Sequence, residues 1–290
     1  MSDILFQRSN SGLNNQHLFY GVDYVAYTEG GDSLSFEKVL NGEFNDSSID
    51  KLFWEFIVKN YSNKSFKFKP IGSKSTLKLL LDKFMRDNIS HNLICTDSEF
   101  DEVFNDKIDS DKIIYTYGYS WENDVWNENL LVFLINQLTG IDNNKEEIFN
   151  DFNMFLNHID CHVKYDAHFF KTDSKYFPRP NGHQKLINCD SNSYPNVMRE
   201  QLQKIIDDLQ IDEKLEEQIL TNYSALNVKK YCYGHLFNDF CKNYIKYYLR
   251  VKHKLTGIAD DIIRRLAISN FLTFLPANVT RYYSTTLSVL

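Results

Sequence analysis

Cysteine and proline are both scarce in this 290-residue sequence, which contains five of each. An odd number of cysteines without any C-x-x-C pair gives no basis for a disulfide framework. Long apolar runs are missing as well: the longest spans residues 130–135 and is far too short to cross a membrane as a helix. The first residues lack the charged and apolar regions of a signal peptide, so we expect a protein of the reducing cytoplasm, away from membranes.

Two catalytic motifs are absent. No G-x-x-x-x-G-K-[ST] occurs, which excludes ATP hydrolysis by a P-loop, and no G-x-S-x-G elbow marks a serine nucleophile. The hydrophobic content of 43% is nevertheless enough for a packed core. The net charge of −7 argues against tight constitutive binding to nucleic acid.

Charge is unevenly distributed along the chain. Residues 97–128 contain ten acidic and two basic side chains, a net of −8, whereas residues 228–254 contain seven basic and one acidic side chain, a net of +6. An acidic metal-binding centre and a basic helix would together suit a polyanionic substrate. Two solvated faces are the alternative, because charge runs usually have that role.

Strand and helix patterns alternate in the N-terminal half of the chain. Strands are expected at 19–26, 66–71, 93–96 and 113–116, and helices at 48–61, 73–84 and 124–138, with Gly140 ending the last one. This order predicts an α/β fold with a mostly parallel sheet and right-handed crossovers.

Helical patterns dominate after residue 142. They cover 146–156, 196–209, 212–223, 229–254 and 258–275, with a loop at 171–195 that holds three of the five prolines. We therefore expect an α/β domain at 18–141 and a mainly helical domain at 142–290.

Two acidic clusters each follow an apolar strand. Glu29 begins the segment Glu-Gly-Gly-Asp that ends at Asp32, and Asp97, Glu99 and Asp101 follow the strand at 93–96. Carboxyl ends of parallel strands meet at one edge of a sheet, which is where such folds bind ligands. Strand periodicity would direct Asp97 and Glu99 to the same face. These carboxylates could hold Mg²⁺, with Mn²⁺ as an alternative ion.

A second metal ion would lie ~3.5–4 Å from the first in a two-metal phosphoryl-transfer site. Asp101 or Glu122 would be its ligand. For Glu122, the alternative is a carboxylate stabilised at a helix N-terminus. Lys74 could steady a phosphate near the start of a helix, although a surface lysine is the commoner explanation for such a residue.

The order of these motifs resembles that of Toprim-like nucleases. The motifs are Thr28-Glu29-Gly30-Gly31-Asp32, Gly72-Ser73-Lys74, Thr96-Asp97-Ser98-Glu99-Phe100-Asp101 and Ser120-Trp121-Glu122-Asn123. The usual pattern has D-x-D where this chain has Asp97-Ser98-Glu99. More narrowly, residues 19–140 resemble the Toprim-related effector subunits of anti-phage systems of the PARIS type.

The resemblance implies a toxic effector that cleaves RNA or DNA, with host tRNA as a known type of target. It also implies an ABC-class ATPase partner that holds the effector inactive until phage infection. Glu29, Asp97, Glu99, Glu122 and Lys74 would then be catalytic, and Glu29, Asp97, Glu99 and Asp101 would bind the metal. Homodimerisation of the active effector is left open.

The basic helix offers a second candidate surface. Lys242, Lys246, Arg250 and Lys254 recur every four residues and form one stripe, which could follow a nucleic-acid backbone or be a solvated face. Two other functions also remain open. One is a non-catalytic Toprim-fold module that docks on an ATPase, and the other is a primase- or topoisomerase-like enzyme.

Overall fold

The computed structural model describes residues 10–45, 48–179 and 181–290. Contacts divide the chain into two compact units: the residues up to Tyr117 together with Leu275–Leu290, and Gly118–Phe274. This division differs from the expected boundary at 141/142 in two ways: residues 118–141 belong to the second unit, and Leu275–Leu290 belongs to the first. Within the described ranges, none of the helices has both the length and the apolar character that crossing a membrane requires.

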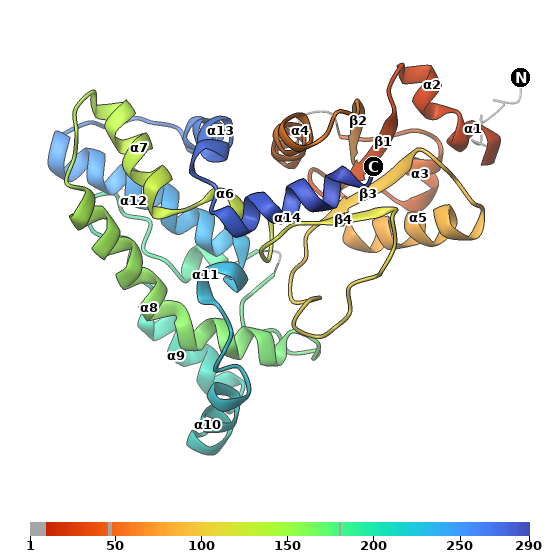
Figure 1. Cartoon of the computed structure of the whole chain (residues 1–290). Helices are drawn as coiled ribbons and strands as arrows, with labels where there is room; N and C mark the ends of the chain where they lie inside the picture. Colours follow the sequence, from red (N-terminus) through yellow and green to blue (C-terminus); the bar gives the residue numbers. More distant parts are fainter. Residues whose placement is uncertain (1–9, 46–47, 180) are drawn as a thin grey trace, which may run out of the picture. The chain divides into compact units, whose positions relative to one another are not determined.

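A four-stranded sheet with all strands parallel forms the centre of the first unit (Figure 1). Its strands are β1 (Tyr24–Thr28), β2 (Phe66–Pro70), β3 (Asn92–Thr96) and β4 (Ile113–Tyr115), in the order β2-β1-β3-β4. The predicted α/β class and parallel sheet are confirmed. The predicted start of the first strand at residue 19 is wrong, because α2 (Gln16–Tyr20) precedes it and ends at Gly21 with a left-handed φ of 63°.

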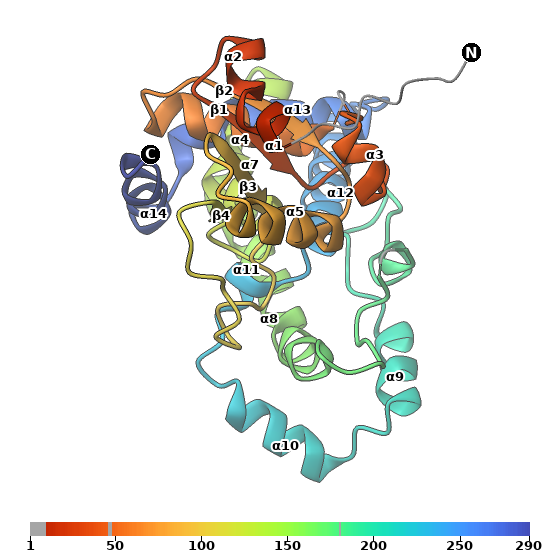
Figure 2. The ribbon, with the colours of Figure 1, turned by 90° about the vertical axis from the view of Figure 1, so that its right-hand side faces the viewer.

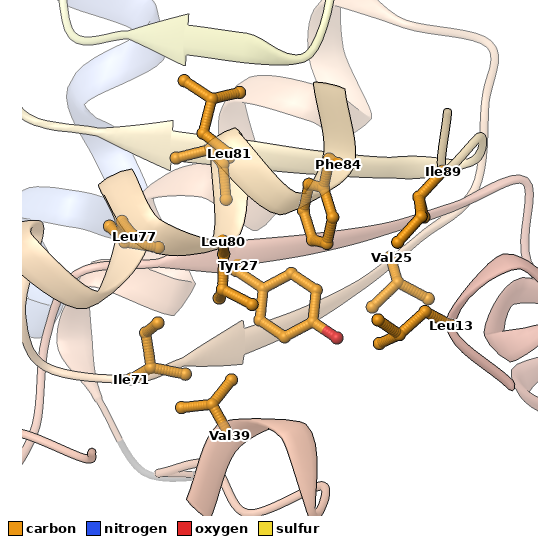
Figure 3. Packing of buried hydrophobic residues seen from close by; sticks show 11 residues of the cluster. Leu13, Val25, Tyr27, Val39, Ile71, Leu77, Leu80, Leu81, Phe84 and Ile89 are labelled. Carbon is orange, nitrogen blue, oxygen red and sulfur yellow. The ribbon is translucent and has the colours of Figure 1, made fainter. Parts of the chain in front are cut away.

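Helix α5 (Lys74–Arg86) packs its apolar side against β1 and β3 (Figure 3). Leu80 and Phe84 from α5 are fully buried there with Val25 and Tyr27 from β1, and the Tyr27 and Phe84 ring centroids lie 5.7 Å apart. Helices α1 (Asn10–Asn14) and α3 (Phe36–Leu40) add Leu13 and Val39 to this core. The spacing of apolar residues in α5 is therefore the reason why it covers the sheet.

The last helix, α14 (Ala277–Ser288), belongs to the first unit because its tyrosines contact residues of that unit. Tyr283 packs edge-on against Phe53 of α4 (Ile49–Tyr61), and Tyr282 donates a hydrogen bond of 3.0 Å to the carbonyl of Tyr115 at the end of β4. The expected helices end at residue 275, so neither α14 nor its return to the first unit was predicted.

The described part of the second unit is helical (Figures 1 and 2). It contains α6 (Trp121–Val125), α7 (Glu128–Thr139), α8 (Lys145–Phe169), η1 (His183–Lys185), α9 (Arg199–Asp208), α10 (Glu213–Asn222), α11 (Val228–Tyr231), α12 (Gly234–His253), α13 (Asp260–Asn270) and η2 (Phe271–Phe274). Two expected helices are each broken in two: Asn127 caps α7 through its side chain, and Cys232 and Tyr233 separate α11 from α12.

The packing of α5 can be tested with two neighbouring leucines. Leu80 is completely buried, whereas Leu79 is 52% exposed. We expect Leu80→Ala to lower the free energy of unfolding by about 2–5 kcal/mol, because it leaves a cavity under the sheet. Leu79→Ala should change it by less than about 0.5 kcal/mol. Urea denaturation followed by circular dichroism measures both, and equal effects would contradict this packing.

Candidate functional site

The first acidic cluster and the second meet at the carboxyl edge of the sheet. Parallel pairing sets Thr28, the last residue of β1, beside Cys95 of β3. Glu29 therefore lies next to the end of β3 at Thr96. One carboxylate oxygen of Glu29 accepts a hydrogen bond of 2.9 Å from the backbone N–H of Asp97 and another from the Thr96 hydroxyl. The structure thus joins Glu29 to the start of the second cluster, as the order of the strands predicts.

The segment after β3 is a turn and not an extended strand. Strand β3 ends at Thr96, and Glu99 has a left-handed φ of 47°, which is strained for a residue with a side chain. The expectation that strand periodicity aligns Asp97 with Glu99 is therefore wrong. The turn instead directs Glu99 and Asp101 back toward the start of α5.

The ammonium of Lys74 lies among the oxygen atoms of this turn. Its Nζ donates hydrogen bonds to Glu99 Oε2 at 2.6 Å, to Asp101 Oδ2 at 3.0 Å and to the backbone carbonyl of Asp97 at 3.0 Å. Only 16% of the Lys74 side chain is exposed, so the surface-lysine explanation is wrong. Lys74 is the first residue of α5, and the Ser73 hydroxyl before it accepts the Thr76 N–H.

The electrostatics of the cluster follow from this arrangement. Burial, together with the nearby Glu99 carboxylate, raises the pKa of Glu29 to about 7, and the hydrogen bond from Thr96 opposes this rise. Burial alone would lower the pKa of Lys74, but the carboxylates of Glu99 and Asp101 outweigh that effect and raise it. Lys74 is therefore a permanent positive charge within the cluster.

Hard carboxylate and carbonyl oxygens are the chemistry that Mg²⁺ requires, so the donor types in the cluster suit it. The arrangement does not, because the point on which the oxygens converge is filled by the Lys74 ammonium. Among the residues that the structure describes, no group of three or more His, Cys, Asp or Glu side chains is placed to hold a metal ion. The expected ligands Glu29, Asp97, Glu99 and Asp101 thus do not fit a divalent ion as they stand.

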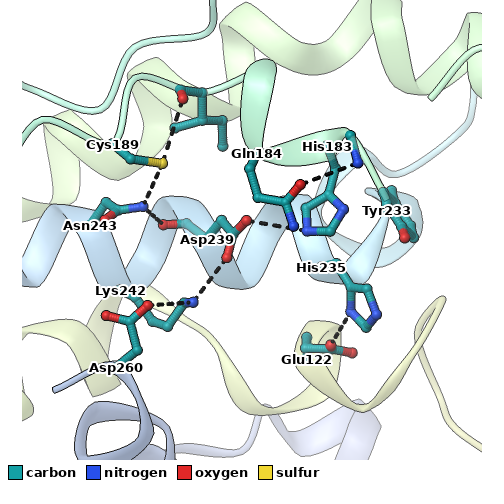
Figure 4. Close-up of polar contacts among 12 residues, drawn as sticks. Glu122, His183, Gln184, Cys189, Tyr233, His235, Asp239, Lys242, Asn243 and Asp260 are labelled. Atoms are coloured by element: carbon teal, nitrogen blue, oxygen red, sulfur yellow. Dashed lines mark hydrogen bonds and ion pairs between the residues drawn. The ribbon is translucent and has the colours of Figure 1, made fainter. Parts of the chain in front are cut away.

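Glu122 has its partners within the second unit (Figure 4). Its buried carboxylate bonds to Nδ1 of His235 at 2.9 Å through one oxygen and accepts from the Ser120 hydroxyl at 2.5 Å through the other. Burial would raise the pKa of Glu122, but the bonds to His235 and Ser120 hold it below its ordinary value. His235 is separated from Glu122 by 113 positions, so no local pattern could have identified the pair.

The basic stripe of α12 is partly neutralised by carboxylates of the same unit (Figure 4). Lys242 is 6% exposed and pairs with Asp239 at 2.9 Å and Asp260 at 3.0 Å, while Lys246 also pairs with Asp260. Burial would raise the pKa of Asp239, yet bonds from His183 and Lys242 lower it. The expectation of four equivalent cations on one exposed face is therefore wrong.

The other two residues of the stripe are exposed. Arg250 donates a hydrogen bond of 3.3 Å to the Ser191 hydroxyl and Lys254 one of 3.1 Å to the Val251 carbonyl. Arg250 and Lys246 line a hollow of about 250 Å³ beside the segment 255–258. If the helix contacts phosphate, this end of it is the part that remains accessible.

A comparison with protein-family models finds none that matches this chain, and a comparison with curated proteins finds no match either. The resemblance to Toprim-like nucleases therefore depends on the order of the motifs in the sequence.

The pKa of Glu29 predicts how stability depends on pH. Between its ordinary value of 4.5 and its native value of about 7, the unfolded chain has released this proton while the native chain keeps it, so stability falls as the pH rises. Glu29→Gln cannot ionise. We expect it to be more stable relative to wild type at pH 8 than at pH 5, by about 1–2 kcal/mol after allowance for solvent screening.

Urea denaturation at the two pH values measures this difference. Glu37→Gln, at the exposed start of α3, is the control. Its free energy of unfolding should differ from that of wild type by the same amount at both pH values. A Glu29→Gln effect that is independent of pH would contradict the raised pKa.

Lys242 gives a second prediction. Lys242→Met leaves the buried Asp239 without its closest cation, so we expect the free energy of unfolding to fall by about 3 kcal/mol. Arg250→Met, two turns later on the same helix but exposed, should change it by less than about 0.5 kcal/mol. Thermal denaturation of both variants measures this, and similar effects would show that Lys242 is not a structural cation.

Proposed function

We propose that this chain is a Toprim-like, metal-dependent endonuclease that hydrolyses phosphodiester bonds of RNA, with tRNA favoured, or of DNA. It would act in the cytoplasm as the toxic effector of an anti-phage system and be controlled by an ABC-class ATPase. The observation that supports this proposal is the meeting of Glu29, Glu99 and Asp101 with Lys74 at the carboxyl edge of a parallel sheet. Ligands of such folds bind at this edge.

Each residue of the cluster has a role in the proposal. The carboxylates supply the hard oxygens, and the positive charge of Lys74 offsets part of the negative charge that they would present to a substrate phosphate. Mg²⁺ or Mn²⁺, when bound, would activate water and neutralise charge on the phosphate. We assign no individual step to the ion, because the observed arrangement does not hold one.

A second function is favoured by a specific observation. Lys74 forms ion pairs with two carboxylates of the cluster, and a non-catalytic Toprim-fold module would need such internal pairing to remain stable without a metal. Such a module would dock on the ATPase through surfaces of the same fold and would cleave nothing.

Expression without the ATPase distinguishes the two functions. Wild type, Asp97→Asn and Asp32→Asn are produced in cells, and RNA ends are mapped by sequencing. We expect new ends, foremost in tRNA, with wild type and with the exposed Asp32→Asn control, and at least a hundredfold fewer with Asp97→Asn. Removal of one catalytic group commonly costs two to three powers of ten.

Purified protein and labelled tRNA or DNA provide the complementary test, with Mg²⁺ or with EDTA. Cleavage only with Mg²⁺ supports the endonuclease. Absence of cleavage in cells and in solution, with and without the ATPase, would overturn it and favour the docking module.

A further inference from the structure

A hollow of about 360 Å³ opens between α8 and α9 in the second unit. Its lining residues in α9 lie between positions 199 and 206 at the spacing of a single helix face, so that face forms one wall. Side chains of α8 at positions 157, 158 and 162 form another wall. Sites for small molecules commonly have volumes of about 300–1,000 Å³. The α8–α9 hollow is therefore large enough for an organic ligand.

Nitrogen donors line the α8–α9 hollow. They come from Arg199 of α9 and from Asn157, His158 and His162 of α8. The Arg199 side chain is exposed, and none of the described residues forms an ion pair or a hydrogen bond with it. Among the described residues that line the hollow, none is acidic. This combination favours an anion as the ligand.

Tyr176 fixes His162 as a hydrogen-bond donor. Nδ1 of His162 lies 2.5 Å from the Tyr176 hydroxyl, and the buried Tyr176 has no other hydrogen-bond partner in the described part of the chain. A buried hydroxyl needs an acceptor, so it donates to Nδ1. Burial lowers the pKa of His162 to about 4, although the Glu216 carboxylate opposes this effect, so the ring is neutral at pH 7. The ring proton is therefore on Nε2, which can donate to a ligand.

A phosphate monoester matches these donors better than a carboxylate does. It carries a charge of about −1.5 to −2 at pH 7 and three acceptor oxygens. A guanidinium can bind two of those oxygens side by side, which leaves the third for an imidazole N–H. We propose that the α8–α9 hollow binds a phosphate monoester with a flat ring, such as a mononucleotide. Arg199 and His162 hold the phosphate, and the ring contacts the apolar lining residues, which are Val197, Leu202 and Ile206.

Two carboxylates of the same unit that could repel a phosphate have partners of their own. Asp160 of α8 pairs with Lys164 at 2.6 Å, and Glu216 of α10 accepts a hydrogen bond from the Tyr165 hydroxyl. These partners limit the repulsion that either carboxylate would exert on a bound phosphate.

Calorimetric titration of the protein tests the proposal with three probes: adenosine 5′-monophosphate, adenosine and inorganic phosphate. We expect the monophosphate to bind at least tenfold more tightly than either of the other two, because only the monophosphate uses both the donors and the apolar side chains. Equal affinity for the monophosphate and for either other probe would overturn the proposal. So would the absence of binding by the monophosphate at millimolar concentration.

Two cations of α9 provide matched variants. Arg199→Gln and Lys204→Gln each remove one exposed positive charge, but only Arg199 lines the hollow. We expect Arg199→Gln to weaken binding of the monophosphate at least about tenfold, because hydrogen bonds to a charged group are lost. Lys204→Gln should bind like wild type. Equal losses in the two variants would indicate a general attraction between charges and would overturn the site.

A measurement on wild type is independent of how well the variants fold. The imidazole ¹⁵N resonances are followed by NMR while adenosine 5′-monophosphate is added. We expect the Nε2 resonance of His162 to shift, and the resonances of His17 in the first unit to stay unchanged. An unchanged His162 resonance at saturating nucleotide would overturn the proposal.

Activity separates this site from the proposed function, because the α8–α9 hollow and the acidic cluster belong to different units. Binding of the monophosphate without any cleavage of nucleic acid refutes the endonuclease and leaves the nucleotide site intact. Cleavage without binding of the monophosphate refutes the nucleotide site alone.

Discussion

The parallel pairing of β1 with β3 determines both the core of the first unit and the position of its charged cluster. Val25 pairs with Asn92 and Thr28 with Cys95, and this register ends the two strands at nearly the same level. A shift of one residue would turn every side chain of β1 to the opposite face. Tyr27 would then leave the core under α5, and the Glu29 carboxylate would lose its bond to the Asp97 N–H. The core thus enforces the geometry of the cluster.

Electrostatics then require a cation at this edge of the sheet. Carboxylates that are gathered away from water raise each other's pKa, as Glu99 does for Glu29, and remain ionised only beside a positive charge. Lys74 provides that charge from the first residue of α5, and the strained backbone of Glu99 is the local cost of directing a second carboxylate to it. Fold stability and any chemistry of the cluster therefore depend on the same cation.

Local patterns predicted much of the fold, because the apolar periodicity of β2, β3, α4 and α5 is decided by burial against the sheet. The meeting of Glu29 with Asp97 was also predictable, since it follows from parallel strands alone. Pairs between separate elements were not predictable from local patterns. They are Lys74 with Glu99, Glu122 with His235, and Lys242 with Asp260. The spacing of charges along one helix does not show which carboxylates of another helix will pair with them.

The most direct test of the proposed metal-dependent function is a crystal structure of the protein grown with Mn²⁺, with anomalous scattering recorded to locate the metal. We predict an anomalous peak beside the carboxylates of Glu29, Glu99 and Asp101. At saturating Mn²⁺, the absence of a peak there, with Lys74 still bound to Glu99 and Asp101, would contradict the account. The cluster would then be a structural ion-pair network.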